Sequence, residues 1–198
     1  MSTTVLIKSS SGITSVPVEA KHISERRLFI TGNINAGSAV EFMKQMMYLN
    51  SEGDAPISVF INTDGGEINS GMLMYDVIVG SKAPIRMYCT GMAYSMGAVL
   101  FSCAGERYML PNSEIMIHQP LLLGGQVSGN ASSIKSVSDS LLETKKKMNR
   151  ILALHTGRTE EEVDEQTAYD HFFTAEEAIA WGLCDGVKTF GEMMEESL

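Results

Sequence analysis

IRMYCTGMAYSMGAVLFSCA, residues 85–104, is the stretch of the sequence that says most about the fold. Its first five residues, 85–89, are mostly apolar and β-prone, and they predict a strand. From Ser95 to about Ala104, a run of small and apolar residues predicts a helix. A strand that leads through a short turn into a helix is the building block of a βαβ unit.

The same alternation precedes this stretch. Residues 27–32 form a short β-prone run closed by glycine, and residues 38–49 carry apolar side chains at helical spacing. Residues 56–62 then predict a strand, and residues 67–80 predict a helix. Strands that alternate with helices predict a mainly parallel sheet built from βαβ units, so the expected fold class is α/β.

Helical signals dominate the C-terminal part of the chain. A long helix near residues 132–156 carries one apolar stripe, made of Ile134, Val137, Leu141, Met148, Ile151 and Leu152. Gly157 follows as a stop signal. Two capping boxes come next, each a Thr with a Glu three residues later: Thr159 with Glu162, and Thr174 with Glu177. Gly182 marks the expected end of the second of these helices.

Length and composition indicate one folded domain. The chain has 198 residues and 44% hydrophobic content, enough for a single core of ordinary size. Residues 1–17 are rich in Ser and Thr, so we expect a flexible N-terminal arm followed by one domain over residues 18–198. The net charge of -9 argues against nucleic acid as the main partner, because binding phosphates needs clustered Lys and Arg.

Several other classes of protein are disfavoured. No stretch approaches the ~18 apolar residues of a membrane span, and the first residues carry no apolar core of a secretory signal. The three cysteines, Cys89, Cys103 and Cys184, lie far apart and form no C-x-x-C or Cys/His cluster. We therefore expect a cytoplasmic protein without membrane contact, disulfide framework, metal or other cofactor.

The turn before Ser95 is the first candidate for chemistry. In GMAYSMGA, residues 91–98, small residues flank a serine between a strand and a helix, which lets the hydroxyl project from a sharp bend. The following N–H, that of Met96, would lie at a helix N-terminus and suit an oxyanion. By itself the pattern is weak, and an ordinary helix N-cap is the simpler explanation of Ser95.

Two further segments follow strands. Asn62-Thr-Asp-Gly-Gly66 ends the strand near 56–62, and paired glycines there let a substrate come close to the backbone, although a plain turn is the simpler reading. His118 ends the apolar run Ile115-Met-Ile. A neutral His takes a serine proton near pH 7 if a partner orients it, but a lone His is more often a satisfied core residue.

Together, these segments resemble the caseinolytic protease (ClpP) family. The resemblance rests on GMAYSMGA, the turn LPNS at 110–113 that leads to MIHQP at 116–120, LHTG at 154–157, and FTAEEA at 173–178 ahead of Gly182-Leu183. It covers residues 18–190 with the motifs in family order. The implied fold is a ClpP/crotonase-like spiral of βαβ units with a protruding handle helix, the handle spanning about 120–156.

The resemblance also implies the active-site residues. Ser95 would be the nucleophile and His118 the general base, and Asp170, just before the FTAEEA segment, would orient the histidine. Gly66 and Met96 would supply the oxyanion-hole N–H groups. Gly124 and Gly125 would begin a strand that binds an extended peptide by main-chain pairing. No metal takes part in this chemistry.

Quaternary structure follows from the same resemblance. ClpP subunits form heptameric rings, and two rings stack into a tetradecamer around a closed chamber, which unfolded proteins and peptides enter with the help of a ring-shaped AAA+ unfoldase. The positions expected to receive the unfoldase are Ser58, Phe60, Gly80, Tyr88, Thr90, Tyr108 and Leu110. Three of them, Ser58, Gly80 and Thr90, are small or polar, which predicts weak docking to rings of this chain alone.

Departures from the family pattern leave rival functions open. Asp64 replaces the usual proline before the two glycines, Tyr94 replaces a small residue before the nucleophile, and His171 replaces an arginine after the triad Asp. One rival is a weakly active structural subunit that shares mixed rings with a paralogue. The other is a crotonase-like acyl-CoA enzyme, which needs no Ser-His-Asp set.

Overall fold

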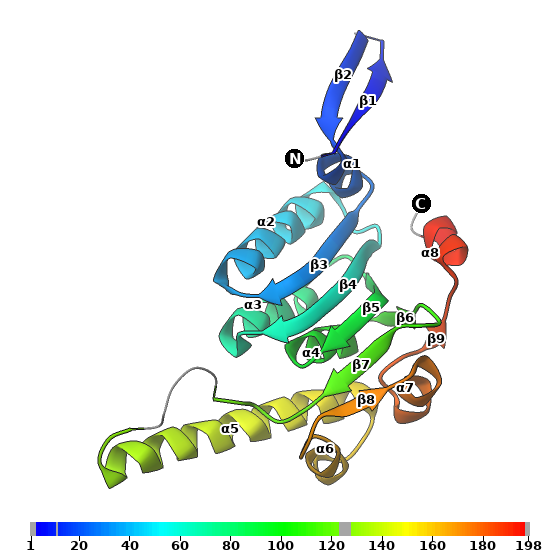
Figure 1. The fold of residues 1–198 in the computed structure, drawn as a ribbon. Coiled ribbons are helices and arrows are strands. Elements are labelled where there is room, and N and C mark those ends of the chain that lie inside the picture. Colours follow the sequence, from blue (N-terminus) through cyan, green and yellow to red (C-terminus); the bar gives the residue numbers. More distant parts are fainter. Residues whose placement is uncertain (1–2, 11, 123–127, 197–198) are drawn as a thin grey trace.

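The computed structural model describes residues 3–10, 12–122 and 128–196. Its main sheet has the strand order β3-β4-β5-β6-β9, with β7 beside β5 and β8 beside β7 (Figure 1). The strands are β3 (Arg27–Ile34), β4 (Ile57–Gly66), β5 (Ile85–Tyr94), β6 (Glu106–Met109), β7 (Glu114–Ile117), β8 (His171–Phe173) and β9 (Gly186–Val187). Every pairing is parallel except that of β7 with β8. The predicted α/β fold with a mainly parallel sheet is confirmed.

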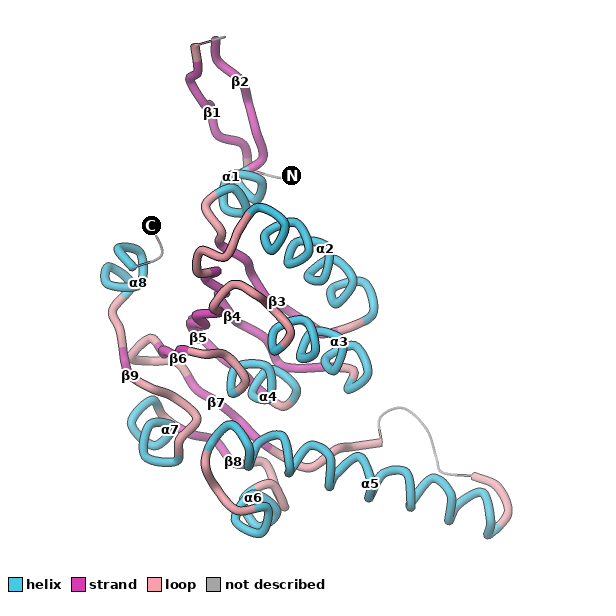
Figure 2. The backbone as a smooth tube through the Cα atoms, turned by 180° about the vertical axis from the view of Figure 1, so that it is seen from behind, coloured by secondary structure: helices cyan, strands magenta, loops and turns pink. Residues whose placement is uncertain are grey.

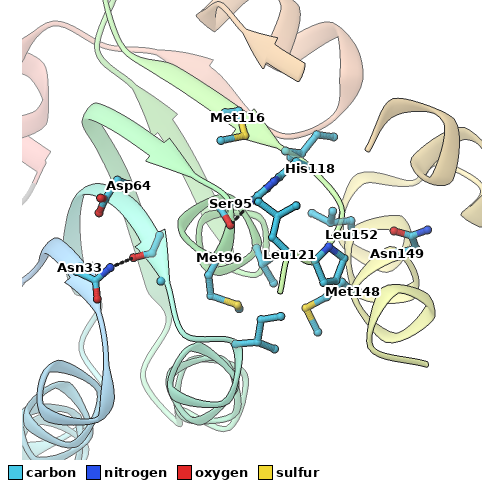
Figure 3. A pocket seen from close by; sticks show the side chains of 16 residues that line it. Asn33, Asp64, Ser95, Met96, Met116, His118, Leu121, Met148, Asn149 and Leu152 are labelled. Atoms are coloured by element: carbon cyan, nitrogen blue, oxygen red, sulfur yellow. Dashed lines mark hydrogen bonds between the residues drawn. The ribbon is translucent and has the colours of Figure 1, made fainter. Parts of the chain in front are cut away.

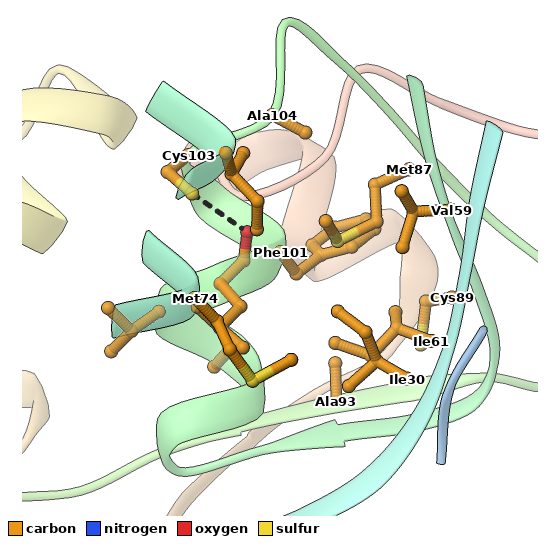
Figure 4. Close-up of a cluster of buried hydrophobic side chains, with 14 of the residues drawn as sticks. Ile30, Val59, Ile61, Met74, Met87, Cys89, Ala93, Phe101, Cys103 and Ala104 are labelled. Atoms are coloured by element: carbon orange, nitrogen blue, oxygen red, sulfur yellow. Dashed lines mark hydrogen bonds between the residues drawn. The ribbon is translucent and has the colours of Figure 1, made fainter. Parts of the chain in front are cut away.

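Three helices cover one face of this sheet, as seen from behind in Figure 2. They are α2 (Ala36–Glu52), α3 (Ile68–Val79) and α4 (Met96–Ser102), each of which follows one strand and precedes the next. Alternate residues of the strands point into the core between sheet and helices. Figure 4 shows Ile30, Val59, Ile61, Met87 and Cys89 of the strands opposite Met74 of α3 and Phe101 of α4.

The opposite face of the sheet carries an aromatic row. Phe29, Phe60, Tyr88 and Tyr108 occupy matching positions on β3, β4, β5 and β6, and each ring stacks on the next at 5.2–5.8 Å between centroids. The C-terminal helix α8 (Phe190–Glu196) packs here through the fully buried Met193, beside Phe60 and Tyr88. A helix that no sequence signal predicted thus covers part of the row.

The long helix α5 (Ala131–Thr156) confirms the expected handle helix, and Gly157 ends it in the left-handed conformation. Both capping boxes form, at the start of α6 (Glu160–Gln166) and of α7 (Ala175–Trp181). Only the C-terminal part of the α5 apolar stripe is buried, at Met148, Ile151 and Leu152. The N-terminal part extends away from the sheet (Figure 1), and its residues 131–140 are exposed.

The expected N-terminal arm, residues 1–17, contains an antiparallel hairpin among its described residues. Strand β1 (Thr4–Ser9) pairs with β2 (Gly12–Pro17), and the hairpin projects from the body ahead of α1 (Val18–Ser24) (Figure 1). Exposed apolar residues on it include Leu6 and Ile13. Since its residues alternate only weakly between apolar and polar, neither strand was predicted.

Candidate active site

A pocket of about 260 Å³ opens where β4, β5 and β7 end, all at the carboxyl edge of parallel strands. It is lined by Asn33, Asp64, Gly65, Gly66, Ile68, Ser95, Met96, Val99, Met116, Ile117, His118, Pro120, Leu121, Met148, Asn149 and Leu152. In Figure 3, Asn33 and Asp64 lie on one side of Ser95, and His118, Met148 and Leu152 on the other. Four of the predicted site residues, Gly66, Ser95, Met96 and His118, therefore line one pocket.

Ser95 occupies a strained turn between β5 and α4. Its backbone has φ 54° and ψ -117°, in a region that residues other than glycine rarely adopt. The Ser95 N–H donates to the Met116 carbonyl at 2.8 Å, which ties the turn to β7. The hydroxyl makes no capping bond to α4, so the simple N-cap reading does not describe this serine.

The hydroxyl is directed toward His118 instead. Ser95 Oγ and His118 Nε2 lie 2.7 Å apart, within hydrogen-bonding distance (Figure 3). His118 follows the last residue of β7, and only 13% of its side chain is exposed. With Nδ1 protonated, Nε2 is free to accept the hydroxyl proton, which is the geometry of a serine and its general base.

Asp170 lies on the other side of the His118 ring, just before β8. Its Oδ1 is 3.5 Å from His118 Nδ1, and 61% of its side chain is exposed. His118 Nδ1 is buried and makes no hydrogen bond to any described residue. The pair is therefore in the arrangement of an orienting carboxylate and its histidine, at a separation slightly longer than a normal hydrogen bond.

Two glycines bring the end of β4 against the nucleophile turn. A Cβ on Gly65 would lie 2.7 Å from the Tyr94 carbonyl oxygen and 2.9 Å from Ser95 Cβ, so only glycine fits there. Gly66, with φ 150°, allows a similar approach to β3, where a Cβ would lie 2.1 Å from the Ile34 oxygen. The buried Thr63 holds this segment, since its hydroxyl donates to the Gly32 carbonyl and accepts from Gly65 N–H.

The two predicted oxyanion donors, the N–H groups of Gly66 and Met96, belong to residues that line the pocket beside Ser95. Met96 is the first residue of α4, so its N–H has no partner within the helix. The Gly65 N–H is engaged by Thr63 at 3.0 Å, and Gly66 follows it along β4. The Asn33 side chain donates to the Gly65 carbonyl at 3.5 Å and lines the same pocket.

Some pocket residues were not predicted from the sequence. Asn149 and Leu152 come from α5, and Asn33 from β3, far from the candidate motifs in the chain. Asn149 is 5% exposed and donates to Asp164 Oδ1 at 2.7 Å. No motif marks these positions, because only the packing of α5 across the sheet edge brings them here. Gly124 and Gly125, the predicted peptide-binding residues, lie outside the described residues.

Tyr94, directly before the nucleophile in the chain, is half-buried. Its hydroxyl donates to Glu114 Oε2 at 2.8 Å, and this bond is the main cause that raises the pKa of Tyr94 above its usual value. The ring meets Phe172 of β8 edge-on at 5.6 Å. Tyr94, which stands where the family pattern has a small residue, thus contacts β8, the strand that follows Asp170.

Comparison with protein families shows which family the chain belongs to. A model of the family described as Clp protease matches residues 11–190, nearly the whole length of the chain. The chain belongs to the Clp protease family. The parallel sheet of βαβ units and the long α5 helix agree with the ClpP/crotonase fold. Each helix in the part of the chain that the structure describes is too short or too polar to span a lipid bilayer.

Proposed function

We propose that this Clp protease family member is a serine endopeptidase that cleaves unfolded polypeptides inside a ring-shaped chamber. The observation that carries the proposal is the 2.7 Å contact between Ser95 Oγ and His118 Nε2 at a strained strand-to-helix turn. Family membership supports the same reaction class. The protein would act in the cytoplasm and would need no metal or cofactor.

The proposed reaction is acyl transfer. Ser95 Oγ attacks the peptide carbonyl carbon while His118 Nε2 takes the hydroxyl proton. The resulting oxyanion accepts hydrogen bonds from the Gly66 and Met96 N–H groups, and Asp170 orients the imidazolium. His118 then gives its proton to the leaving amine, which leaves an ester on Ser95. Water, deprotonated by His118, hydrolyses the ester and restores the serine.

Peptide binding would use the apolar part of the pocket. Ile68, Met96, Val99, Met148 and Leu152 surround the space beside Ser95, so a medium-sized apolar side chain of the substrate fits there best. Gly124 and Gly125 are proposed to pair with the extended substrate backbone. We propose further that the subunits assemble into heptameric rings and a double-ring tetradecamer, as the family resemblance implies.

Docking of an AAA+ unfoldase is proposed to be weak in rings of this chain alone. Ser58, Gly80 and Thr90 offer little apolar surface at the expected positions. Phe60 and Tyr88, two of the apolar residues at those positions, are already buried with Met193 of α8. Less apolar area is then left for a partner to bury. A paralogue in a mixed particle would supply the docking face instead.

A second candidate function is that of a structural subunit with little activity. The 3.5 Å separation of His118 Nδ1 from Asp170 and the absence of a hydrogen bond to that nitrogen among the described residues favour it. Cleavage of short fluorogenic peptides separates the two candidates. The purified homomer should cleave them with turnover well above a Ser95→Ala control, and cleavage that appears only after mixing with a paralogue would support the structural subunit.

A further inference from the structure

The segments that carry His118 and Asp170 meet at Gln119. The Gln119 N–H donates to the Thr167 carbonyl at 2.7 Å, and its side-chain Nε2 donates to the Ala168 carbonyl at 2.8 Å. Gln119 directly follows His118 in the chain, and Ala168 precedes Asp170 by two residues. One residue therefore makes two hydrogen bonds between the base-bearing and acid-bearing segments.

The segment that accepts these hydrogen bonds is itself bonded to helices α5 and α6 through Thr167. Thr167 is 1% exposed, and its hydroxyl donates to the Val163 carbonyl of α6 at 2.8 Å and lies 3.4 Å from Asn149 Oδ1 of α5. Its N–H also donates to Val163 at 2.9 Å. Thr167 is thus held at the end of α6, and the two hydrogen bonds of Gln119 connect the histidine-bearing segment to this point.

The sheet joins the two segments on the other side of the His118–Asp170 pair. The β7–β8 ladder reaches the pair of Ile117 with His171, one residue before His118 and one residue after Asp170, whereas Gln119 bonds to the residues that precede Asp170. The 167–170 stretch lies between the end of α6 and that ladder. Because His118 and Asp170 are already 3.5 Å apart, a small shift of either segment decides whether they form a hydrogen bond.

We propose that Gln119 is a positioning residue that sets the distance between His118 Nδ1 and Asp170. The proposal rests on the proposed peptidase function. The amide suits the role because it donates to a carbonyl without carrying charge, whereas Met has a similar length and no donor. Partners that orient a functional histidine typically contribute 10- to 100-fold to activity, as known for metal-bound histidines.

The test compares two matched substitutions on full-length assembled protein. Gln119→Met should lower kcat for a fluorogenic peptide by about 10- to 100-fold with little change in KM, because misplacing a catalytic group affects the transition state most. Gln45→Met is the control, since it makes the same substitution at a side chain that bonds to Glu41 of the same helix, α2, and takes no part in the Gln119 contacts. It should change kcat by less than about threefold.

A double-mutant cycle separates positioning from general loss of structure. If Gln119 acts through Asp170, Gln119→Met should have almost no further effect in an Asp170→Ala background. Equal losses in both backgrounds, or an unchanged kcat in Gln119→Met, would overturn the proposal. Gln119→Asn, which keeps an amide but shortens its reach, replaces Gln119→Met if sedimentation shows that the latter does not assemble, and the same outcomes apply.

The failure of the proposed function has a different signature. In that case the wild type itself neither cleaves peptide nor reacts with a fluorophosphonate at Ser95, and the role of Gln119 falls with it. A wild type that is active, with a Gln119→Met variant that is equally active, overturns the positioning role alone.

Discussion

Ser95 combines a strained backbone with a directed hydroxyl. A positive φ on a non-glycine residue costs about 1–3 kcal/mol, and the surrounding structure must hold it in place. Here the Met116 carbonyl accepts the Ser95 N–H, and Gly65 packs against the turn from β4. This backbone conformation directs Oγ toward His118 and places the Met96 N–H at the start of α4. A serine that capped the helix with its hydroxyl would not combine these two features.

Asp64 is the residue whose charge we expect to affect the reaction. It is exposed and lines the pocket on the Asn33 side of Ser95 (Figure 3). A charge at 4 Å in water contributes only about 1 kcal/mol, and less at greater distance. Asp64→Asn should therefore raise kcat by at most about fivefold, with the gain shrinking as salt screens the wild-type charge. Peptide cleavage at two ionic strengths checks this, and a fall in kcat would contradict it.

His155 gives the fold a dependence on pH. Burial, with a smaller contribution from Arg107, lowers its pKa, and its Nε2 lies 3.0 Å from the Tyr75 hydroxyl. The folded state thus favours the neutral imidazole, while the unfolded chain titrates near pH 6.5. The stabilisation is complete above about pH 6.5 and is lost as the pH falls through the lowered folded value.

His155→Gln removes this titration. Between pH 7.5 and 5, the free energy of unfolding should fall more steeply for the wild type than for the variant. Urea denaturation of both proteins at one protein concentration measures the two slopes. Equal slopes would show that His155 protonates as readily in the folded protein as in the unfolded chain.

Individual residues differ in how far the sequence reveals them. Ser95 and His118 follow predicted strands, and parallel strands end at one edge of a sheet, so their proximity was predictable. Asp170 came only from the family resemblance, because nothing local distinguishes it among 24 acidic residues. The bond from Gln119 to Ala168 spans 49 positions and depends on how α6 packs, which no local pattern encodes.

Among the secondary-structure elements, the sequence-based predictions differ from the structure mainly in where the strands end. The sequence predicted strands over 56–62 and 85–89, whereas β4 and β5 run to Gly66 and Tyr94. Both continue past a shift in register, where Thr63 pairs with Ala93. Glycines read as a turn are thus part of a strand, because pairing with neighbours, and not local propensity, decides strand length.

The helix α8 depends on one buried side chain. Met193 is fully buried beside Phe60 and Tyr88, and Glu196 of the same helix pairs with Lys188. Met193→Ala should cost about 2–5 kcal/mol of local stability and release α8 from the aromatic row. Binding of a hydrophobic dye should rise, and hydrogen exchange in residues 190–196 should quicken. Unchanged exchange would mean that the polar contacts of α8, such as the Lys188 ion pair and the bond from Arg86 to the Glu196 carbonyl, hold the helix without Met193.

For the whole molecule, the unburied half of α5 is the main indication of self-association. Ile134, Val137 and Leu142 are 39–53% exposed on a helix that extends beyond the body. Val137→Glu places a charge on this surface and should shift the particle toward smaller species in sedimentation velocity. Ser138→Glu adds the same charge at the exposed neighbouring position and should leave the distribution unchanged. If both variants sediment like the wild type, this part of α5 does not contact another subunit.

The central claim, that Ser95 is a nucleophile activated by His118, is tested most directly by covalent labelling. The wild type treated with a fluorophosphonate should gain one adduct per subunit, and mass spectrometry of its peptides should place that adduct on Ser95. Ser95→Ala should assemble normally, gain no adduct and lose roughly 10^6 in peptide turnover. Labelling at another residue, or a Ser95→Ala variant that keeps more than about a tenth of wild-type turnover, would contradict the account.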